Sequence, residues 1–530
     1  MYLSTMFLNG FDSYDEYFSA CCKFLGDNEW IFNYPVTDIL VHDIPSLVPD
    51  SWIHALSSLS EEEFRRFPVY LVKEDWPASL IAFCQWSKKL KLKPEIFNPS
   101  EKLELPEIIK AGVTPKKTHE VDNLVPFIHS LCSDHSINRI VDIGSGLGYL
   151  DLFLYVKYGH TILGVESGKK LVETSTSRFH KVKAALPSNH VGEIKYIESY
   201  VNPESINSLS LKITTFFSES SDENDFSSKS TEKSQINFTD VALEKSTESI
   251  SNLHFTEKLS LSDSFKHTGA KQVEYSDCTK TNGVCLVGLH TCGDLCIDSL
   301  NLFMSTDCCK LCVLLACCYH KMTGQTPNGT NNIASSIPPS NSFRNFPLSS
   351  SLKQTASSYP SASSFLQIPF LRLAANETAD RWFHMSAEKR ASQLFHTMAR
   401  AVIQLYLHQN HLTSKKTKRR CVTKIPTNDF KAYVTSFLSR YHISTESGET
   451  FHPNLTIIAA IMDLWEKFKP KKKVISILLC LQANIQFVAE SLIVADRVKY
   501  LLERNAKEVR VVRVMDDSVS PRALALCVHK

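Results

Sequence analysis

Apolar and polar positions along the chain follow patterns that differ from one region to the next. Residues 111–200 alternate short apolar runs with stretches of helical spacing, which is typical of β/α units. The alternation resumes at Gly283 and returns after residue 366. In this last region the pattern predicts helices at Ala387–Leu407 and Asn484–Arg504 and strands at Val474–Leu479, Val511–Val514 and Ala523–Val528. Together these elements predict an α/β fold with a Rossmann-like, doubly wound sheet.

The first 110 residues have a helical pattern punctuated by prolines. Ser60 and Glu63 have the spacing of a capping box, which predicts the start of a helix that Pro68 ends. No feature of this region suggests catalytic chemistry. The chain is therefore expected to hold a helical N-terminal subdomain, 1–110, and a larger α/β domain, 111–530.

Two segments interrupt the α/β pattern. Residues 201–276 contain 17 serines, mixed charge and little periodicity. Residues 324–365 are rich in Ser, Pro, Asn and Thr and have no acidic residue. Such compositions bury too little apolar surface to offset the entropy of ordering. Both segments are predicted to be disordered insertions.

Composition narrows the class of protein. The 530 residues are 43% hydrophobic and 22% charged, and 58 Lys+Arg against 56 Asp+Glu leave a net charge of +2. Any contact with nucleic acid must therefore be local. Residues 1–10 lack the basic flank of a signal peptide, and no apolar run approaches the roughly 18 residues of a membrane span. We expect an intracellular protein, in cytoplasm or nucleus, without a membrane partner, whose 16 cysteines are mostly free thiols.

A glycine-rich loop supplies the strongest chemical signal. The apolar strand Arg139–Ile143 contains Asp142 and runs directly into a G-x-G-x-G turn. A helix and a second strand follow, and the second strand ends in Glu166, which is placed to accept hydrogen bonds from a ribose diol. Glycines let the backbone approach a ligand closely. The candidate binding residues in this loop are Asp142, Gly144, Gly146, Gly148 and Glu166.

The spacing of this loop bears on which nucleotide it would hold. It is not the G-x-G-x-x-G of dinucleotide-binding folds, and an acid precedes its first glycine. The Asp142 carboxylate would repel a pyrophosphate but favour a cationic amine. S-adenosylmethionine carries an amine and a sulfonium and no phosphate, so it is the expected cofactor. A glycine-rich turn without cofactor and a nicotinamide-binding fold remain the alternatives.

Two further strands end in polar clusters where an acceptor substrate would meet the cofactor. Val284–Leu289 is followed by His290, and Lys310–Ala316 by Cys317. Ligands of doubly wound sheets bind at such strand ends. The candidate catalytic residues are His290, Asp294, Cys317, Cys318, Tyr319 and His320.

Their roles stay open at the level of sequence. His290, His320 or Asp294 would serve as general base, although Asp294 could instead cap the following helix. Tyr319 could stack on or orient a planar acceptor. Cys317 and Cys318 could line the slot or bind a metal. Zinc is the competing use of Cys309-x-x-Cys312, but no second C-x-x-C pair accompanies it, and no metal ligand is assigned.

Several motifs resemble those of the methyltransferase-like protein 25 family. They include residues 76–80 (WPASL), 114–120 (TPKKTHE), 288–295 (GLHTCGDL), 317–323 (CCYHKMT), 346–349 (FPLS), 491–497 (SLIVADR) and 520–522 (SPR). The resemblance covers most of the chain outside the serine-rich segments. It implies a methyltransferase with a helical N-terminal region and a cofactor site at Asp142, Gly144, Gly146 and Glu166, but it supplies no substrate.

The acceptor is expected to be RNA rather than protein. The cysteine-containing turns are also similar, more distantly, to those of a tRNA ribose 2′-O-methyltransferase family. The basic runs 415–420 and 469–473 could contact phosphates, carry a nuclear address or form solvated loops. Lys117, His119 and Glu120 precede the first strand and could lie against the cofactor or face water. A catalytically inactive binding module for RNA or protein is the alternative function, and nothing constrains the oligomeric state.

Overall fold

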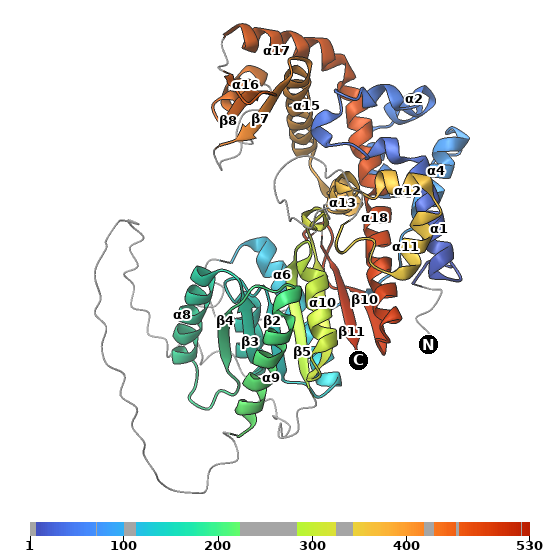
Figure 1. The fold of residues 1–530 in the computed structure, drawn as a ribbon. Helices are drawn as coiled ribbons and strands as arrows, with labels where there is room; N and C mark the ends of the chain where they lie inside the picture. The colour runs from blue at the N-terminus through green and yellow to red at the C-terminus, as the bar shows by residue number, and fades with distance from the viewer. Residues whose placement is uncertain are drawn as a thin grey trace, which may run out of the picture.

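The computed structural model describes residues 7–69, 71–99, 113–222, 283–324, 343–417, 429–451, 455–520 and 522–530. Its centre is an eight-stranded sheet in the order β1-β10-β11-β6-β5-β2-β3-β4 (Figure 1). Five neighbouring strands are parallel: β2 (Arg139–Ile143), β3 (Thr161–Glu166), β4 (Ile194–Glu198), β5 (Val284–Thr291) and β6 (Cys309–Ala316). This is the doubly wound, Rossmann-like sheet that the sequence predicted.

The other edge of the sheet is built from distant parts of the chain. β11 (Leu524–His529) lies antiparallel between β6 and β10 (Glu508–Arg513). The short strand β1 (Glu95–Ile96), from the N-terminal region, pairs in parallel with β10. The α/β domain therefore uses both ends of the chain.

The order of the parallel strands creates a switch point between β2 and β5. From β2 the chain proceeds outward to β3 and β4, and it then returns to the other side of β2 to form β5 and β6. Loops that leave β2 and β5 diverge at such a point and open a crevice at the carboxyl ends of the strands. The glycine loop and the His290 cluster both lie at this edge.

Helices cover both faces of the sheet. One face packs against α6 (Pro115–Asp134), α7 (Tyr149–Tyr158) and α8 (Lys169–Ala185). The opposite face packs against α9 (Ile206–Asp222), α10 (Leu295–Ser305) and α18 (Lys472–Glu503). Strands enclosed on both faces need continuous apolar sequence, which explains the apolar runs of β5 and β6.

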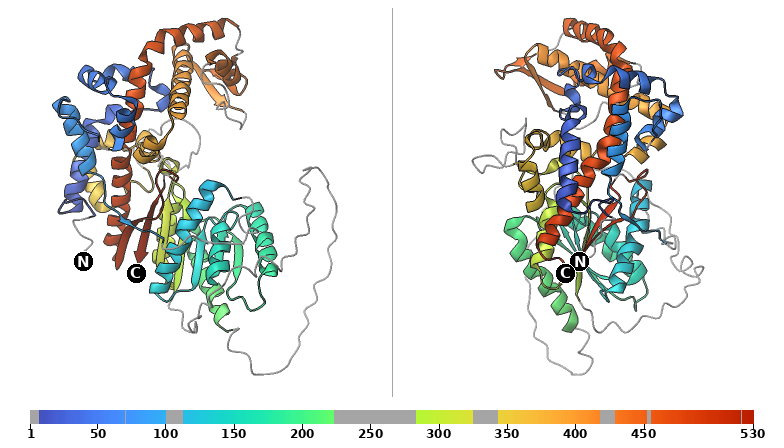
Figure 2. Two further views of the ribbon diagram at one scale, coloured as in Figure 1. Left: turned by 180° about the vertical axis from the view of Figure 1, so that it is seen from behind. Right: turned by 90° about the vertical axis from the view of Figure 1, so that its right-hand side faces the viewer.

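The N-terminal residues form helices, including α1 (Tyr14–Asp27), α2 (Asp50–Ser57), α3 (Glu61–Arg66) and α4 (Ala78–Lys89). They pack around α18, as Figure 2 shows for the blue and red helices. Gln482 of α18 donates to the Ile31 carbonyl at 2.9 Å, and Ser491 accepts the Leu92 amide at 3.2 Å. The predicted capping box of Ser60 and Glu63 is present. This helical region thus shares its core with the C-terminal part of the chain.

The remaining elements follow the β6 turn. They are α11 (Ser350–Ser357), α12 (Pro360–Phe365), α13 (Ile368–Ala374), α14 (Ala379–His384) and α15 (Ala387–Gln409), followed by α16 (Phe430–Leu438) and α17 (Leu455–Phe468). A separate small sheet joins β7 (Leu412–Lys416), β8 (Tyr441–Thr445) and β9 (Thr450–Phe451) beside α15 to α17 (Figure 1). Lys415 and Lys416 of the first basic run belong to β7, whereas Lys418, Arg419 and Arg420 lie outside the described residues.

The prediction of a strand at Val474–Leu479 is wrong, because these residues lie within α18. Nearly every position of this helix from Ile475 to Leu501 is buried, so its sequence is apolar all round and lacks the helical alternation of a surface helix. In the described part of the chain, Thr456–Glu503 is apolar and long enough to cross a membrane, but its apolar window is wholly buried within the protein. α18, which makes up most of this span, is the central core helix.

The first predicted insertion is wrong at its N-terminal end, and the second is wrong at its C-terminal end. Residues 203–222 form η5 (Pro203–Ser205) and α9, in which Leu209, Ile213 and Phe217 recur every four residues and are buried. At the second segment, residues 343–365 carry α11 and α12, and Phe346 is buried. Serine content concealed the helical spacing in both cases. The rest of the two segments, 223–276 and 325–342, lies outside the described residues.

Candidate active site at the switch point

The glycine loop turns sharply between β2 and α7. Gly144, Gly146 and Gly148 have φ of +73°, +60° and +68°, a region that residues with a Cβ rarely adopt. A Cβ on Gly148 would lie 2.1 Å from the Tyr196 hydroxyl. The Gly144 amide donates to the Val165 carbonyl at 2.8 Å, which fixes the loop to the end of β3. The three glycines thus form a cradle of backbone at the switch point.

Glu166 ends β3 beside this cradle. One carboxylate oxygen accepts the Gly146 amide at 3.0 Å, and the other accepts the Gly168 amide at 2.9 Å. The predicted neighbours Gly146 and Glu166 are thus brought together. These two contacts hold the carboxylate against the glycine loop.

A pair of buried acids lies beneath the loop. Asp142 of β2 is 2% exposed, and Asp151 of α7 is fully buried. Burial first, and then their mutual repulsion, raises the pKa of Asp142 well above its ordinary value; burial raises the pKa of Asp151 to about 6. Two carboxyls this close cannot both ionise easily without a cation.

Several atoms of this pocket lack a hydrogen-bond partner among the described residues. They are Asp142 Oδ1, Ser145 Oγ, both carboxylate oxygens of Asp151 and the Tyr196 hydroxyl, although the Asp151 carboxyl interacts with both Asp142 and the Tyr196 hydroxyl. Buried polar atoms are normally paired, so such a concentration is typical of a ligand site. Acceptor oxygens from two acids suit a positively charged amine far better than a phosphate.

Lys117 of α6 partly balances these acids. Burial lowers its pKa, while the charges of Glu120, Asp142 and Asp151 act in the opposite direction. Its ammonium lies 3.9 Å from Glu120 Oε2. Lys117 therefore connects the acid pair beneath the loop with Glu120 on the other side of the site.

Glu120 and His290 meet on the acceptor side. Glu120 is almost fully buried, and its Oε2 lies 3.0 Å from His290 Nε2, while its Oε1 accepts the Ser520 hydroxyl at 2.9 Å. Burial alone would raise the Glu120 pKa, but His290, the Ser520 hydroxyl and Lys116 lower it to about 2. The carboxylate thus stays ionised and orients the imidazole.

His290 occupies an unusual backbone position. Its φ is +67°, in the left-handed region, at a register shift between β5 and β6. Non-glycine residues held there cluster at functional sites. His119, by contrast, accepts the Asp516 amide at 3.2 Å and faces the β10–β11 connection rather than the glycine loop. Its predicted cofactor role has no support in its position.

Asp294 holds a loop through its carboxylate. Its two carboxylate oxygens accept the Thr323 amide at 2.8 Å and the Asn345 side-chain amide at 2.7 Å. Its side chain does not cap α10, although its backbone starts that helix. Side-chain capping by Asp294 therefore does not fit the structure, whereas its role as a general base stays a prediction.

Tyr319 and His320 lie in different surroundings. The Tyr319 ring is 2% exposed, and its hydroxyl donates to Glu490 at 3.1 Å, so the ring does not face an acceptor and the stacking role predicted for it does not fit. The His320 side chain is partly exposed, and burial and then the charge of Arg372 lower its pKa. Its Nδ1 has no partner among the residues that the structure describes. His320 is therefore still a candidate general base, as an alternative to His290.

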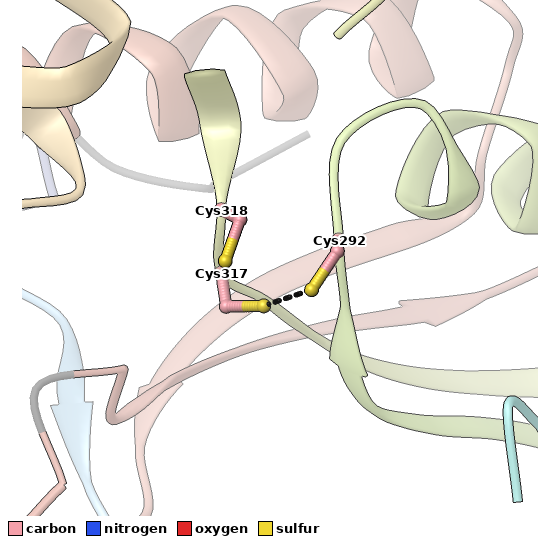
Figure 3. A group of neighbouring side chains, drawn as sticks. All are labelled: Cys292, Cys317 and Cys318. Atoms are coloured by element: carbon pink, nitrogen blue, oxygen red, sulfur yellow. Dashed lines mark hydrogen bonds between the residues drawn. The ribbon is translucent and has the colours of Figure 1, made fainter. Parts of the chain in front are cut away.

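The three predicted cysteines come together. The sulfur atoms of Cys292, Cys317 and Cys318 all lie within 4.8 Å of one another, between the turns that follow β5 and β6 (Figure 3). Cys309 and Cys312, the C-x-x-C pair, are instead buried within β6 and outside this cluster.

Sequence reasoning missed four residues that shape the site, for identifiable reasons. Asp151 is an acid within the apolar stretch Leu150–Tyr155, and that exception was a readable signal. Ser520 lies in the SPR motif noted above, but its place in the site was not predicted, and Tyr196 and Glu490 gave no signal because only the tertiary fold brings them to the site.

Comparisons with known proteins agree with this geometry. Residues 116–325 match the family model described as "Methyltransferase domain". The chain is 24% identical over 480 residues to the mouse protein "Probable methyltransferase-like protein 25", which covers 78% of this chain and 75% of that relative. The human protein of the same name is 23% identical over 489 residues, covering 78% and 74%.

These matches include the α6 segment, the glycine loop and both strand-end turns. The chain therefore carries a methyltransferase domain. It is similar to methyltransferase-like protein 25 over most of its length, which confirms the resemblance that its motifs indicated.

Proposed function

We propose that the protein is an S-adenosylmethionine-dependent methyltransferase that acts on RNA. The observation that carries the proposal is the glycine cradle beside the buried acid pair Asp142 and Asp151, at the switch point of a methyltransferase sheet. A cationic ligand there would relieve the repulsion between two buried carboxyls.

The residues of the cradle fit this cofactor. Asp142 and Asp151 would bind its amine, and Glu166 would accept hydrogen bonds from its ribose hydroxyls. The three glycines would let the cofactor approach the backbone of the loop closely. When bound, the cofactor supplies an electrophilic methyl group. Glu166 already accepts the Gly146 amide and so stabilises the conformation of the loop.

On the acceptor side, His290 would take up the proton that the acceptor atom loses. Its Nε2 is hydrogen-bonded to Glu120, so Nδ1 is the nitrogen that would accept the proton. The buried carboxylate of Glu120 would stabilise the imidazolium that forms, and it orients the ring. In this arrangement His290 is the catalytic residue and Glu120 a positioning residue.

The charge around the acceptor side favours RNA over protein. Lys116 is half exposed beside Glu120, and Lys321 and Arg372 act electrostatically on His320. Local cations of this kind attract phosphates even though the whole chain is close to neutral. The more distant resemblance to a tRNA ribose methyltransferase family points the same way.

Cofactor binding gives the first test. Calorimetric titration of the full chain with S-adenosylmethionine should show saturable binding that Asp142→Ala weakens by about ten-fold or more, an effect of over 1.4 kcal/mol. Asp134→Ala removes an exposed acid at the end of α6 and is the matched control. Folded wild-type protein that shows no binding of S-adenosylmethionine would refute the proposal.

Methyl transfer gives the second test. The chain would be incubated with methyl-labelled cofactor and separated RNA and protein fractions, beside His290→Ala as a control. Label in RNA that His290→Ala abolishes supports the proposal. Label in protein alone would overturn the choice of RNA, and binding without transfer to either fraction would favour the catalytically inactive binding module.

A further inference from the structure

Three thiols gather where the acceptor crevice ends. Cys292 follows β5, and Cys317 and Cys318 follow β6. All three sulfurs lie within 4.8 Å of one another, and the Cys292 and Cys317 sulfurs are 2.7 Å apart (Figure 3). Cys317 is buried, whereas Cys292 and Cys318 are partly exposed. The cluster is therefore enclosed on one side and reachable from the other.

The two turns that carry the thiols are tightly joined. Gly293 has a φ of +57°, and a Cβ there would lie 2.7 Å from the Lys321 carbonyl oxygen. Only glycine lets the two turns approach this closely. Its presence directly after Cys292 explains how residues 25 positions apart bring their sulfurs together.

Other contacts fix each turn separately. Asp294 accepts the Thr323 amide at 2.8 Å, which ties the first turn to the chain beyond the second. Tyr319 donates to Glu490, and Glu490 pairs with Arg522 at 2.9 Å, which ties the second turn to α18 and β11. The thiols are thus presented by rigid backbone, as a preformed ligand site requires.

The surroundings carry positive charge. Lys321 acts electrostatically on Cys292, and Arg522 on Cys317. Three thiolates around a divalent cation leave a net charge of −1, which Lys321 would offset, since Arg522 already pairs with Glu490. The charge balance therefore suits a metal–thiolate centre.

We propose that Cys292, Cys317 and Cys318 bind a Zn²⁺ ion. Thiolates are the ligands that select zinc, and a tetrahedral site with Zn–S bonds of about 2.3 Å places its sulfurs about 3.8 Å apart, within the spread of this cluster. Binding would move the Cys292 and Cys317 sulfurs apart by about 1 Å. Each thiol loses its proton to solvent as its Zn–S bond forms.

The site differs from the one that spacing suggested. It uses neither Cys309 nor Cys312, and it is assembled from two strand ends rather than one local motif. Among the described residues three ligands are present, which leaves a fourth position for water, as in zinc sites that stay open. The ion would also cross-link the two turns that border the acceptor crevice.

Metal content tests the proposal directly. The full chain would be purified under reducing conditions, analysed for metal and titrated with Co²⁺, whose thiolate charge-transfer absorption reports sulfur ligands. We expect about one equivalent of zinc and a Co²⁺ spectrum of three thiolates. Folded wild-type protein that holds no stoichiometric zinc and gives no thiolate absorption would overturn the proposal.

Variants assign the ligands. Cys292→Ser, Cys317→Ser and Cys318→Ser should each weaken metal binding by about ten-fold or more, whereas Cys308→Ser, at a partly exposed cysteine outside the cluster, should not. Circular dichroism would check that each variant folds. If Cys308→Ser lowers metal binding as much as the cluster variants do, the assignment is wrong.

The main competing state is a disulfide between Cys292 and Cys317. Mass spectrometry of alkylated protein, kept from oxidants and reductants, would detect it; that bond in metal-free protein would also overturn the proposal. Neither metal measurement depends on methyl transfer. A chain that binds zinc but ignores S-adenosylmethionine would therefore refute the proposed function and leave the metal site standing.

Discussion

The carboxylate of Glu120 lies 3.0 Å from the imidazole of His290, although 170 residues separate them in sequence. Glu120 comes from α6, before the first parallel strand, and His290 from the end of β5. The contact joins the segment that precedes the glycine loop to the turn that would receive the acceptor. It is the strongest structural link between the two halves of the candidate site.

Replacement of Glu120 by Gln should slow methyl transfer without weakening cofactor binding. The uncharged amide would no longer stabilise an imidazolium on His290, so we expect kcat to fall by about 10²-fold or more while the Kd for S-adenosylmethionine changes little. Steady-state kinetics and calorimetry separate the two effects. If Glu120→Gln and His290→Ala combine additively in kcat, the two residues do not act as a unit.

Replacement of Asp142 by Asn should have opposite effects on stability and on binding. The neutral amide removes first the cost of burying an ionisable carboxyl and then the repulsion with Asp151, so the free energy of unfolding should rise by about 1–2 kcal/mol. Loss of the charge should weaken cofactor binding about ten-fold or more. Chemical denaturation and calorimetry measure the two quantities. A variant that loses stability and keeps its affinity would contradict our interpretation of the pair.

The same acid pair should couple cofactor binding to pH. The folded-state pKa of Asp151 is raised from 3.8 to about 6, so the folded protein binds more protons than the unfolded chain between these values. This group therefore contributes a loss of stability as pH rises from about 4 to 6. A cation favours the ionised pair, and its affinity should rise with pH through that window.

Proton release gives the measurement. Calorimetric titrations at pH 6 in two buffers of different ionisation enthalpy should show net release of protons when S-adenosylmethionine binds. Asp142→Asn should abolish most of that release, whereas Asp134→Asn should leave it unchanged. Proton uptake on binding to wild-type protein would reverse the sign that we derive.

Arg522 should be essential to stability. It is 7% exposed, pairs with Glu490 at 2.9 Å and donates to the Ala374 carbonyl at 3.1 Å. Arg522→Met leaves the Glu490 carboxylate buried without its cation, which should cost about 3–5 kcal/mol. Urea denaturation would measure this loss in the free energy of unfolding. The double variant Arg522→Met/Glu490→Gln should recover part of the loss, and equal losses would exclude a pairing effect.

Local patterns were predictable from the sequence. The stretch from Arg139 to Glu166 was predictable because strand, acid, glycine turn, helix and second acid follow one another within a short span of sequence. The strand ends at His290 and Cys317 were found for the same reason. What each side chain contacts there was not predictable: Asp294 accepts from Thr323 and Asn345, and Tyr319 donates to Glu490.

The errors arose where tertiary burial outweighed local pattern. α18 is apolar on all sides because it passes through the core, so the run at its start looked like a strand. α9 is rich in serine, yet three apolar residues spaced every four positions, Leu209, Ile213 and Phe217, were enough to bury one face. Partners such as Glu490 and Arg522 come from separate elements, and only the fold pairs them.

The position of β11 bears on how the protein is made. This strand follows β6 by more than 200 residues in sequence, yet it lies inside the sheet between β6 and β10. Until β11 is made, β6 has no partner on that side and its edge is open to other chains. Closure of the sheet therefore waits for synthesis of this distant strand, and until then the nascent protein depends on protection from aggregation.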